Sequence, residues 1–233
     1  PKQIEQCVGD LCDTASLEKF FQVEPDTETI VLHCASMVAL GNERRELVMK
    51  VNVQGTQNII DQCFAHKECK KLIYVGSTGS IPELPHGQRM KEPAQFVQEE
   101  SLGVYGQSKA MASQRVLNAA KSGLNACIVM PSGILGPGDA ACGPVTSGLL
   151  MQMRGEVSVG LKGTFNLCDV RDLANGIFLA VVGFVLSAVL ALCFGGTFFR
   201  TQTDIDYIVD NGIRTLILDA SAACHMPDVL EMP

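Results

Sequence analysis

The sequence predicts an α/β protein built on a doubly wound parallel β-sheet. Three short runs, at residues 29–36, 70–77 and 124–133, are continuously apolar rather than alternating, which is typical of strands buried on both faces of a parallel sheet. Longer segments with a helical spacing of apolar residues lie before and between these runs. The alternation of helix and strand predicts βαβ units.

The expected helices cover residues 13–22, 45–66 and 105–123. The third helix ends at Gly123, a favourable residue directly after a helix. Between 80 and 96, three prolines mark a long loop that follows a predicted strand. A loop in this place is where folds of this class bind ligands.

Composition and charge narrow the functional classes. The chain of 233 residues has a net charge of −7 and no Lys/Arg-rich run, which argues against a nucleic-acid or anionic-membrane surface. Its first ten residues lack the pattern of a signal peptide. The ten cysteines form no C-x-x-C pair, and Cys63, His66 and Cys69 have no second pair of ligands beside them. We therefore expect no metal and a reduced, cytoplasmic chain.

A tyrosine and a lysine open the third helix four residues apart. Tyr105 and Lys109 lie on one helical face, where the ammonium group favours the phenolate and is expected to lower the pKa of the tyrosine. Ser77 and Thr78, at the end of a predicted strand, offer a hydroxyl for a substrate carbonyl. Such a spacing also occurs by chance in many helices, so the order of all these elements carries the argument.

In this order the motifs resemble the extended short-chain dehydrogenase/reductase family. The nearest branch contains NAD-dependent epimerases and dehydratases, dihydroflavonol reductases and 3β-hydroxysteroid dehydrogenases. The resemblance runs from about Ile4 to about Leu179 and implies a Rossmann-type fold. The motifs that carry it are VGDLCD, VLHCAS, VNVQGTQNII, YVGSTG, VYGQSKA, IVMPSGILGPGD and FNLCDVRDLANG.

The resemblance implies a hydride transfer between NAD and a secondary alcohol or ketone of a small molecule, such as a nucleotide sugar, a sterol or a flavonoid. Tyr105 would be the general acid/base, Lys109 would bind the nicotinamide ribose, and Ser77 would bind the substrate oxygen. The implied cofactor-binding positions are Asp10, Leu11, Cys34, Ala35, Ser36, Asn52, Pro131 and Ser132. A homodimer is also compatible with the family.

The family begins with a strand, a G-x-x-G-x-x-G turn, a helix and a second strand, whereas this chain begins at about the third strand. Near the other end, CFGGTFFR resembles the end of that turn, with Gly195 and Gly196, and NGIRTLILDA resembles the second strand, ending at Asp219. We therefore expect a circular permutation, in which residues 181–233 supply the first βαβ unit of a core formed by 1–180.

This permutation has three structural consequences. Residues 184–192 would form the central strand, between 213–219 and 29–34. Pro1 and Pro233 would lie close together. The Asp219 carboxylate would favour NAD over NADP, since it accepts hydrogen bonds from a ribose 2′-hydroxyl.

Other interpretations of the C-terminal segment remain open. Val189 and Leu192 stand where the turn requires glycines, which weakens the case for cofactor capture and allows a non-catalytic relative, either a binding or regulatory protein or an inactive fragment. Residues 173–199 contain no charged side chain and are long enough for a membrane span. A chimeric C-terminal end is a further alternative.

Overall fold

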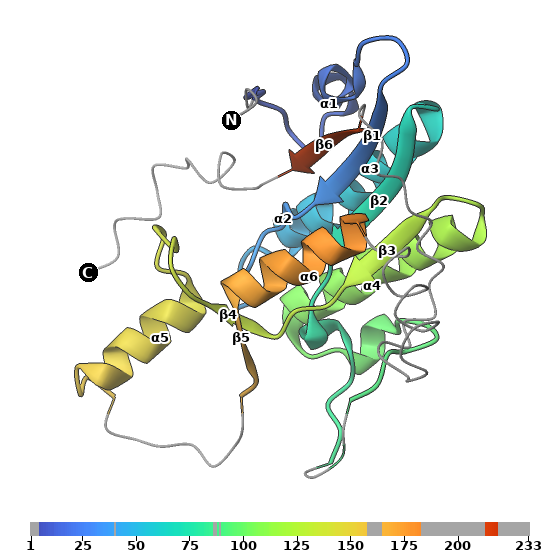
Figure 1. Cartoon of the computed structure of the whole chain (residues 1–233). Helices are drawn as coiled ribbons and strands as arrows, with labels where there is room; N and C mark the ends of the chain where they lie inside the picture. Colours follow the sequence, from blue (N-terminus) through green and yellow to red (C-terminus); the bar gives the residue numbers. More distant parts are fainter. Residues whose placement is uncertain are drawn as a thin grey trace, which may run out of the picture.

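A parallel sheet with helices on both faces forms the body of the protein (Figure 1). The computed structural model describes residues 5–39, 41–85, 88, 90–157 and 165–182, and the backbone of 213–218. The sheet has four strands in the order β3-β2-β1-β6. These are β1 (Glu28–His33), β2 (Cys69–Val75), β3 (Ala126–Val129) and β6 (Ile213–Leu218). The predicted α/β class with a parallel sheet is confirmed.

The three apolar runs of the sequence form β1, β2 and β3, and each pairs in parallel with the next. The third run is divided, because β3 ends at Val129 and a short strand, β4 (Gly133–Leu135), begins after Pro131. Strand β4 pairs with β5 (Leu167–Asp169) in a separate two-stranded parallel sheet.

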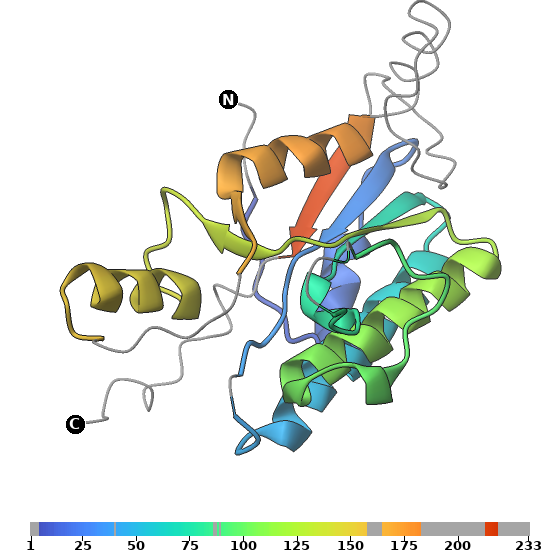
Figure 2. The same cartoon turned by 90° about the horizontal axis from the view of Figure 1, so that it is seen from below.

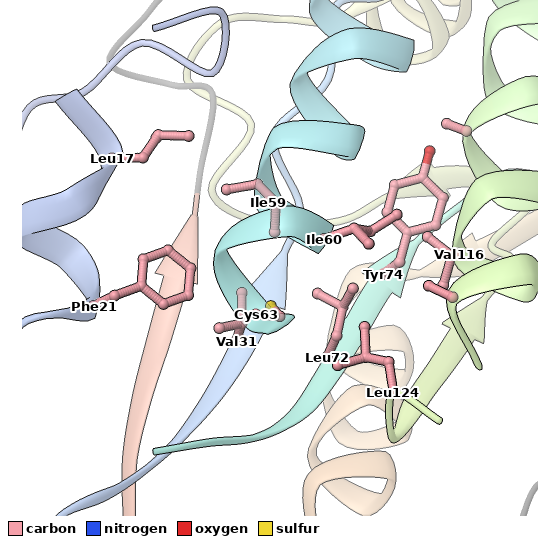
Figure 3. Packing of buried hydrophobic residues seen from close by; sticks show 12 residues of the cluster. Leu17, Phe21, Val31, Ile59, Ile60, Cys63, Leu72, Tyr74, Val116 and Leu124 are labelled. Atoms are coloured by element: carbon pink, nitrogen blue, oxygen red, sulfur yellow. The ribbon is translucent and has the colours of Figure 1, made fainter. Parts of the chain in front are cut away.

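One face of the main sheet is covered by α1 (Thr14–Phe21), α3 (Gly55–Ala65) and α4 (Gly103–Lys121). Their apolar side chains meet those of β1 and β2, as Figure 3 shows for Leu17, Ile59 and Val116 around Val31 and Leu72. Burial of this cluster fixes the two long helices on the strands, and the start of α4 carries the predicted catalytic pair.

The segment before α3 departs from regular α-helix. Helix α2 (Arg45–Met49) leads into a π-helical turn, η1 (Lys50–Gln54), which leads directly into α3. A π turn holds one residue more than an α turn and therefore changes the direction in which the following side chains point. Asn52 lies in this turn and is buried.

The opposite face is covered by α6 (Val170–Val182), as Figure 2 shows. Ala180 of α6 is buried with Ile30 and Ile73 of the sheet. The Lys71 ammonium, also buried, donates a hydrogen bond to the Ala180 carbonyl over 2.8 Å, and this bond anchors the end of the helix to β2. The other described helices are η2 (Thr78–Ser80), η3 (Gln98–Glu100) and α5 (Pro144–Met153).

Strand β6 shows where part of the C-terminal segment lies. It pairs in parallel with β1 from Glu28 opposite Ile213 to His33 opposite Leu218, and Figures 1 and 2 show the two strands side by side. The predicted strand at 213–219 is thus present over 213–218. The predicted insertion of 184–192 between this strand and β1 is wrong, because β6 and β1 are hydrogen-bonded directly.

The remaining C-terminal expectations concern residues that the structure does not describe. These are the segment 184–192, both chain termini, Gly195, Gly196 and Asp219. The permuted order of the chain therefore stays a prediction. Within the described ranges, no helix combines the length and apolar character needed to cross a bilayer.

Candidate active site

The predicted catalytic and cofactor-binding residues gather at the carboxyl ends of neighbouring strands. Cys34, Ala35 and Ser36 follow β1, Ser77 follows β2, and Pro131 with Ser132 follows β3. Because parallel strands present their carboxyl ends to one edge of the sheet, these segments share a single side of the molecule. The start of α4 lies at the same edge, since α4 contacts η2 directly after β2.

Tyr105 lies in the first turn of α4 and is half-buried. Burial raises the pKa of its phenol, while hydrogen bonds from the side chains of Ser77 and Ser36 lower the pKa by a smaller amount. The Ser77 and Ser36 side chains, which follow β2 and β1, therefore lie near the Tyr105 phenol. The expected lowering of the Tyr105 pKa by the neighbouring lysine is wrong for this structure: burial dominates, and the net shift is upward.

Lys109 points from α4 toward the end of β2. Its ammonium group donates a hydrogen bond to the Val75 carbonyl over 2.9 Å, and the side chain is buried. Burial lowers the pKa of Lys109 to about 8, and the negative charge of Cys34 in its thiolate form opposes that shift. The helical spacing correctly places Lys109 on the same helix face as Tyr105, but the ammonium forms its hydrogen bond with β2.

A glycine that sequence analysis did not single out brings the serine loop onto the helix. Ser77 caps η2, since its hydroxyl accepts a hydrogen bond from the Gly79 backbone over 3.1 Å. A Cβ atom at Gly106 would lie only 2.6 Å from the Gly79 carbonyl oxygen. The absence of a side chain beside Tyr105 therefore lets the two segments touch. The only signal in the sequence is the glycine that directly follows the tyrosine.

Asn52 connects the loop after β1 to the catalytic helix. Its amide oxygen accepts a hydrogen bond from the Met37 backbone over 2.7 Å, and its amide nitrogen donates to the Met37 carbonyl and to the Ser108 hydroxyl, both over 2.9 Å. Both amide hydrogens are thus committed within the protein. This geometry positions the segment that contains Cys34–Ser36, and a direct contact between Asn52 and a cofactor ribose stays a prediction.

The Asp10–Leu11 segment is held by two further residues of the same sequence motif. Asn58 donates a hydrogen bond from its side chain to the Leu11 carbonyl over 2.7 Å. A Cβ atom at Gly55 would approach the Leu11 Cβ to 2.8 Å, so only glycine lets the segment pack this closely on α3. From this motif, the sequence analysis predicted a role for Asn52 alone and missed the roles of Gly55 and Asn58.

The third strand end is joined to the serine loop through the backbone. Thr78 donates a hydrogen bond to the Pro131 carbonyl over 3.0 Å, so the proline lies beside the residue that follows Ser77. Pro131 is buried and Ser132 is half-buried. Their predicted contact with a nicotinamide ring stays a prediction.

The described residues fit the nicotinamide part of a dinucleotide. The hydroxyls of Ser36, Ser77 and Tyr105 supply neutral hydrogen-bonding groups, and Lys109 supplies the ammonium group close to the same strand ends. This donor set suits a carboxamide, a ribose hydroxyl and a substrate oxygen. The residues predicted for the adenine ribose and the pyrophosphate, Asp219 with Gly195 and Gly196, lie outside the described part of the chain.

The cysteine and histidine cluster lies elsewhere. His66 stacks on Phe21 with ring centroids 5.1 Å apart and forms a hydrogen bond with Gln62 over 3.0 Å. The Cys63 and Cys69 thiols interact with each other. Among the residues that the structure describes, no group of three or more His, Cys, Asp or Glu side chains is arranged to bind a metal ion.

The fold and this arrangement of Ser77, Tyr105 and Lys109 define a member of the short-chain dehydrogenase/reductase class. The sequence model described as "NAD dependent epimerase/dehydratase family" matches residues 1–183, which is more than half of the chain. The chain therefore belongs to the NAD-dependent epimerase/dehydratase family.

Individual relatives agree with this assignment. The "Sterol-4-alpha-carboxylate 3-dehydrogenase erg26, decarboxylating" of Schizosaccharomyces pombe is 30% identical over 212 residues, covering 89% of this chain and 59% of the relative. The crystal structure of gox2253 is 29% identical with a TM-score of 0.67, covering 75% of this chain and 52% of that one. The UDP-glucose 4-epimerase of Thermus thermophilus, solved in complex with NAD, has a TM-score of 0.66 at 23% identity, covering 79% and 62%.

The similarity to the Thermus thermophilus epimerase, at 23% identity, supports the fold alone. The chain spans less than two thirds of the length of each of these three proteins. Their activities and substrates are therefore considered for this chain only as proposals.

Proposed function

We propose that this chain is a nicotinamide-dependent oxidoreductase or epimerase that moves a hydride at a secondary alcohol or ketone carbon of a small molecule. One observation carries the proposal: Ser77 and Ser36 lie close enough to the Tyr105 phenol to lower its pKa, at the carboxyl edge of a parallel sheet. When bound, the nicotinamide supplies or accepts the hydride. The protein residues bind the substrate oxygen and move its proton.

Each side chain then has a distinct task. The Ser77 hydroxyl donates a hydrogen bond to the substrate oxygen and orients it toward Tyr105. Because burial raises the Tyr105 pKa, the phenol is protonated at neutral pH and can give its proton to a ketone oxygen during reduction. As the phenol gives up this proton, a hydrogen bond from the Ser36 hydroxyl stabilises the phenolate that forms, and in the reverse direction the phenolate takes the proton of the alcohol. Lys109 adds a positive charge at the end of β2 and is assigned to the nicotinamide ribose.

For the substrate class, we favour a sterol-like or steroid-like secondary alcohol over a nucleotide sugar. The support is the similarity to the sterol-4-alpha-carboxylate 3-dehydrogenase of S. pombe, which extends over 89% of this chain. For the cofactor, we favour NAD over NADP, on the ground that the sequence places an acidic residue, Asp219, at the end of a strand.

For the assembly, we propose one Rossmann-type domain in which residues 1–180 form the core and 181–233 contribute the permuted unit. The parallel pairing of β6 with β1 supports a contribution of the C-terminal segment to this sheet. We also propose a cytoplasmic homodimer. The eight cysteines of the described residues are unbridged thiols, as a reducing compartment requires.

A second candidate function is a non-catalytic relative with weak cofactor binding. Val189 and Leu192 favour it, since side chains at the positions of turn glycines obstruct the approach of a pyrophosphate to the backbone. Titration with NADH and with NADPH at one ionic strength, followed by nicotinamide fluorescence, separates the two candidates. Saturable binding that is tighter for NADH, together with turnover of a 3-hydroxysteroid, supports the enzyme. The absence of saturation with either cofactor supports the second candidate.

A further inference from the structure

Among the residues that the structure describes, Lys109 is a buried cation without a carboxylate partner. Its side chain is 2% exposed, and none of the ion pairs among the described residues includes it. One hydrogen bond, to the Val75 carbonyl over 2.9 Å, accounts for one of its three N–H groups. Burying a charged ammonium group costs free energy because the group loses its hydration, so a further stabilising contact is required.

That contact is the face of an aromatic ring. The Lys109 ammonium lies 4.9 Å from the centroid of the Tyr74 ring, within the range of a cation–π interaction. Tyr74 belongs to β2 and is 1% exposed, so the interaction is shielded from water. Its hydroxyl lies near the Thr56 side chain but makes no hydrogen bond of regular geometry within the described part of the chain. The contact with Lys109 is therefore made by the ring and not by the hydroxyl.

We propose that Tyr74 is a positioning residue that keeps Lys109 charged and directed toward the end of β2. Its ring face stands where an acidic side chain would otherwise be needed. An aromatic ring attracts the cation without adding a negative charge. A negative charge would weaken the attraction between the ammonium group and its ligand. The catalytic meaning of this inference rests on the proposed function, whereas the state of Lys109 can be measured without any turnover.

The other titratable groups around Lys109 do not replace the ring. His33 of β1 is fully buried, and burial together with the charge of Lys109 lowers its pKa to about 3, so it is neutral at physiological pH. Tyr105 of α4 is a neutral phenol under the same conditions. Of the described groups, the Cys34 thiol, after β1, is the one whose negative form raises the pKa of Lys109. The test therefore includes Cys34.

The test is a titration of Lys109 in the full chain, followed by NMR of lysine labelled at the side-chain carbon Cε, with the resonance assigned through Lys109→Arg. The Tyr74→Phe variant keeps the ring and is expected to keep the wild-type midpoint. The Tyr74→Leu variant removes the ring and is expected to lower the midpoint by about one pH unit. Leu72→Val, a change on the same strand, controls for loosening of the core, and Cys34→Ala measures the contribution of the thiol.

Two outcomes overturn the proposal: an unchanged midpoint in Tyr74→Leu, or an equal fall in Tyr74→Phe. If Tyr74→Leu does not fold, Tyr74→Met, with a longer flexible side chain, is read in the same way. Where turnover is measurable, the pH profile of kcat should lose its alkaline part in Tyr74→Leu, with less change in KM. A chain without turnover would refute the proposed function and leave the titration to decide the role of Tyr74.

Discussion

Gly106 and Gly79 approach each other so closely that a Cβ atom on Gly106 would lie 2.6 Å from the Gly79 carbonyl oxygen. This contact joins the first turn of α4 to the loop that carries Ser77. It sets the separation between the Ser77 hydroxyl and the Tyr105 phenol, since each belongs to one of the two segments. The catalytic geometry thus depends on a position that contributes no side chain.

Replacing Gly106 by alanine should push the serine loop away from the helix. We expect a loss of unfolding free energy of about 1–3 kcal/mol, as for other overpacked sites, and a loss of turnover larger than stability alone explains. Urea unfolding and steady-state kinetics measure the two effects. The matched control is Gly148→Ala in α5, where a Cβ atom meets nothing within 4 Å and alanine favours the helix. Equal effects of both substitutions would contradict the assigned contact.

Tyr105→Phe should abolish turnover and leave the fold and cofactor binding nearly unchanged, because only the proton-transfer group is lost. Product formation measures turnover. Fluorescence titration with NADH measures cofactor binding, and circular dichroism measures the fold. Wild-type turnover in this variant would remove Tyr105 from its role. Loss of cofactor binding would instead indicate that the hydroxyl supports the structure of the site.

His33 should make the protein sensitive to acid. It is fully buried, its Nε2 atom lies 3.0 Å from the Thr56 hydroxyl, and its pKa is lowered to about 3. The unfolded chain, with a histidine pKa near 6.5, therefore binds more protons than the folded chain between these values, and stability falls as pH falls through that window.

His33→Gln should remove this part of the pH dependence. Between pH 7 and pH 4, the wild-type chain should lose ~3 kcal/mol more unfolding free energy than the variant does. Urea unfolding at several pH values measures the difference. A lower stability of the variant at neutral pH does not affect the comparison, because only the change in unfolding free energy with pH is compared. Parallel pH profiles for the two proteins would show that folding does not lower the pKa of His33.

The permuted order of the chain can be tested by relinking it. In this variant, Pro233 is joined to Pro1 through about six Gly/Ser residues, which span roughly 14 Å, and the chain is opened between Val182 and Gly183. If the two ends lie close together, the variant should unfold within about 1 kcal/mol of the original, since loop closure costs little at this length. Aggregation, or a loss of several kcal/mol, would show that the ends lie far apart.

The sequence was informative where one local pattern determines the structure. Continuous apolar runs located β1 and β2, and the four-residue spacing placed Tyr105 and Lys109 on one helix face. It was not informative where two distant segments meet. Spacing alone does not reveal how deeply Tyr105 is buried, and burial reversed the expected direction of its pKa shift. The resemblance of NGIRTLILDA to the family's second strand identified a strand near 213–218 but not its neighbour, because pairing depends on the whole sheet.

The π-helical turn at Lys50–Gln54 lets one continuous helical segment hold two separate loops. Asn52, within the turn, binds the loop after β1 at Met37, and Asn58, beyond it, binds the Leu11 carbonyl. Deleting one residue from the turn would restore α-helical spacing and rotate everything after it by about 100° relative to Asn52. One of the two asparagines would then face away from its loop. The spacing of the residues in this motif therefore matters as much as their identity. A single-residue deletion there should be more damaging than most substitutions.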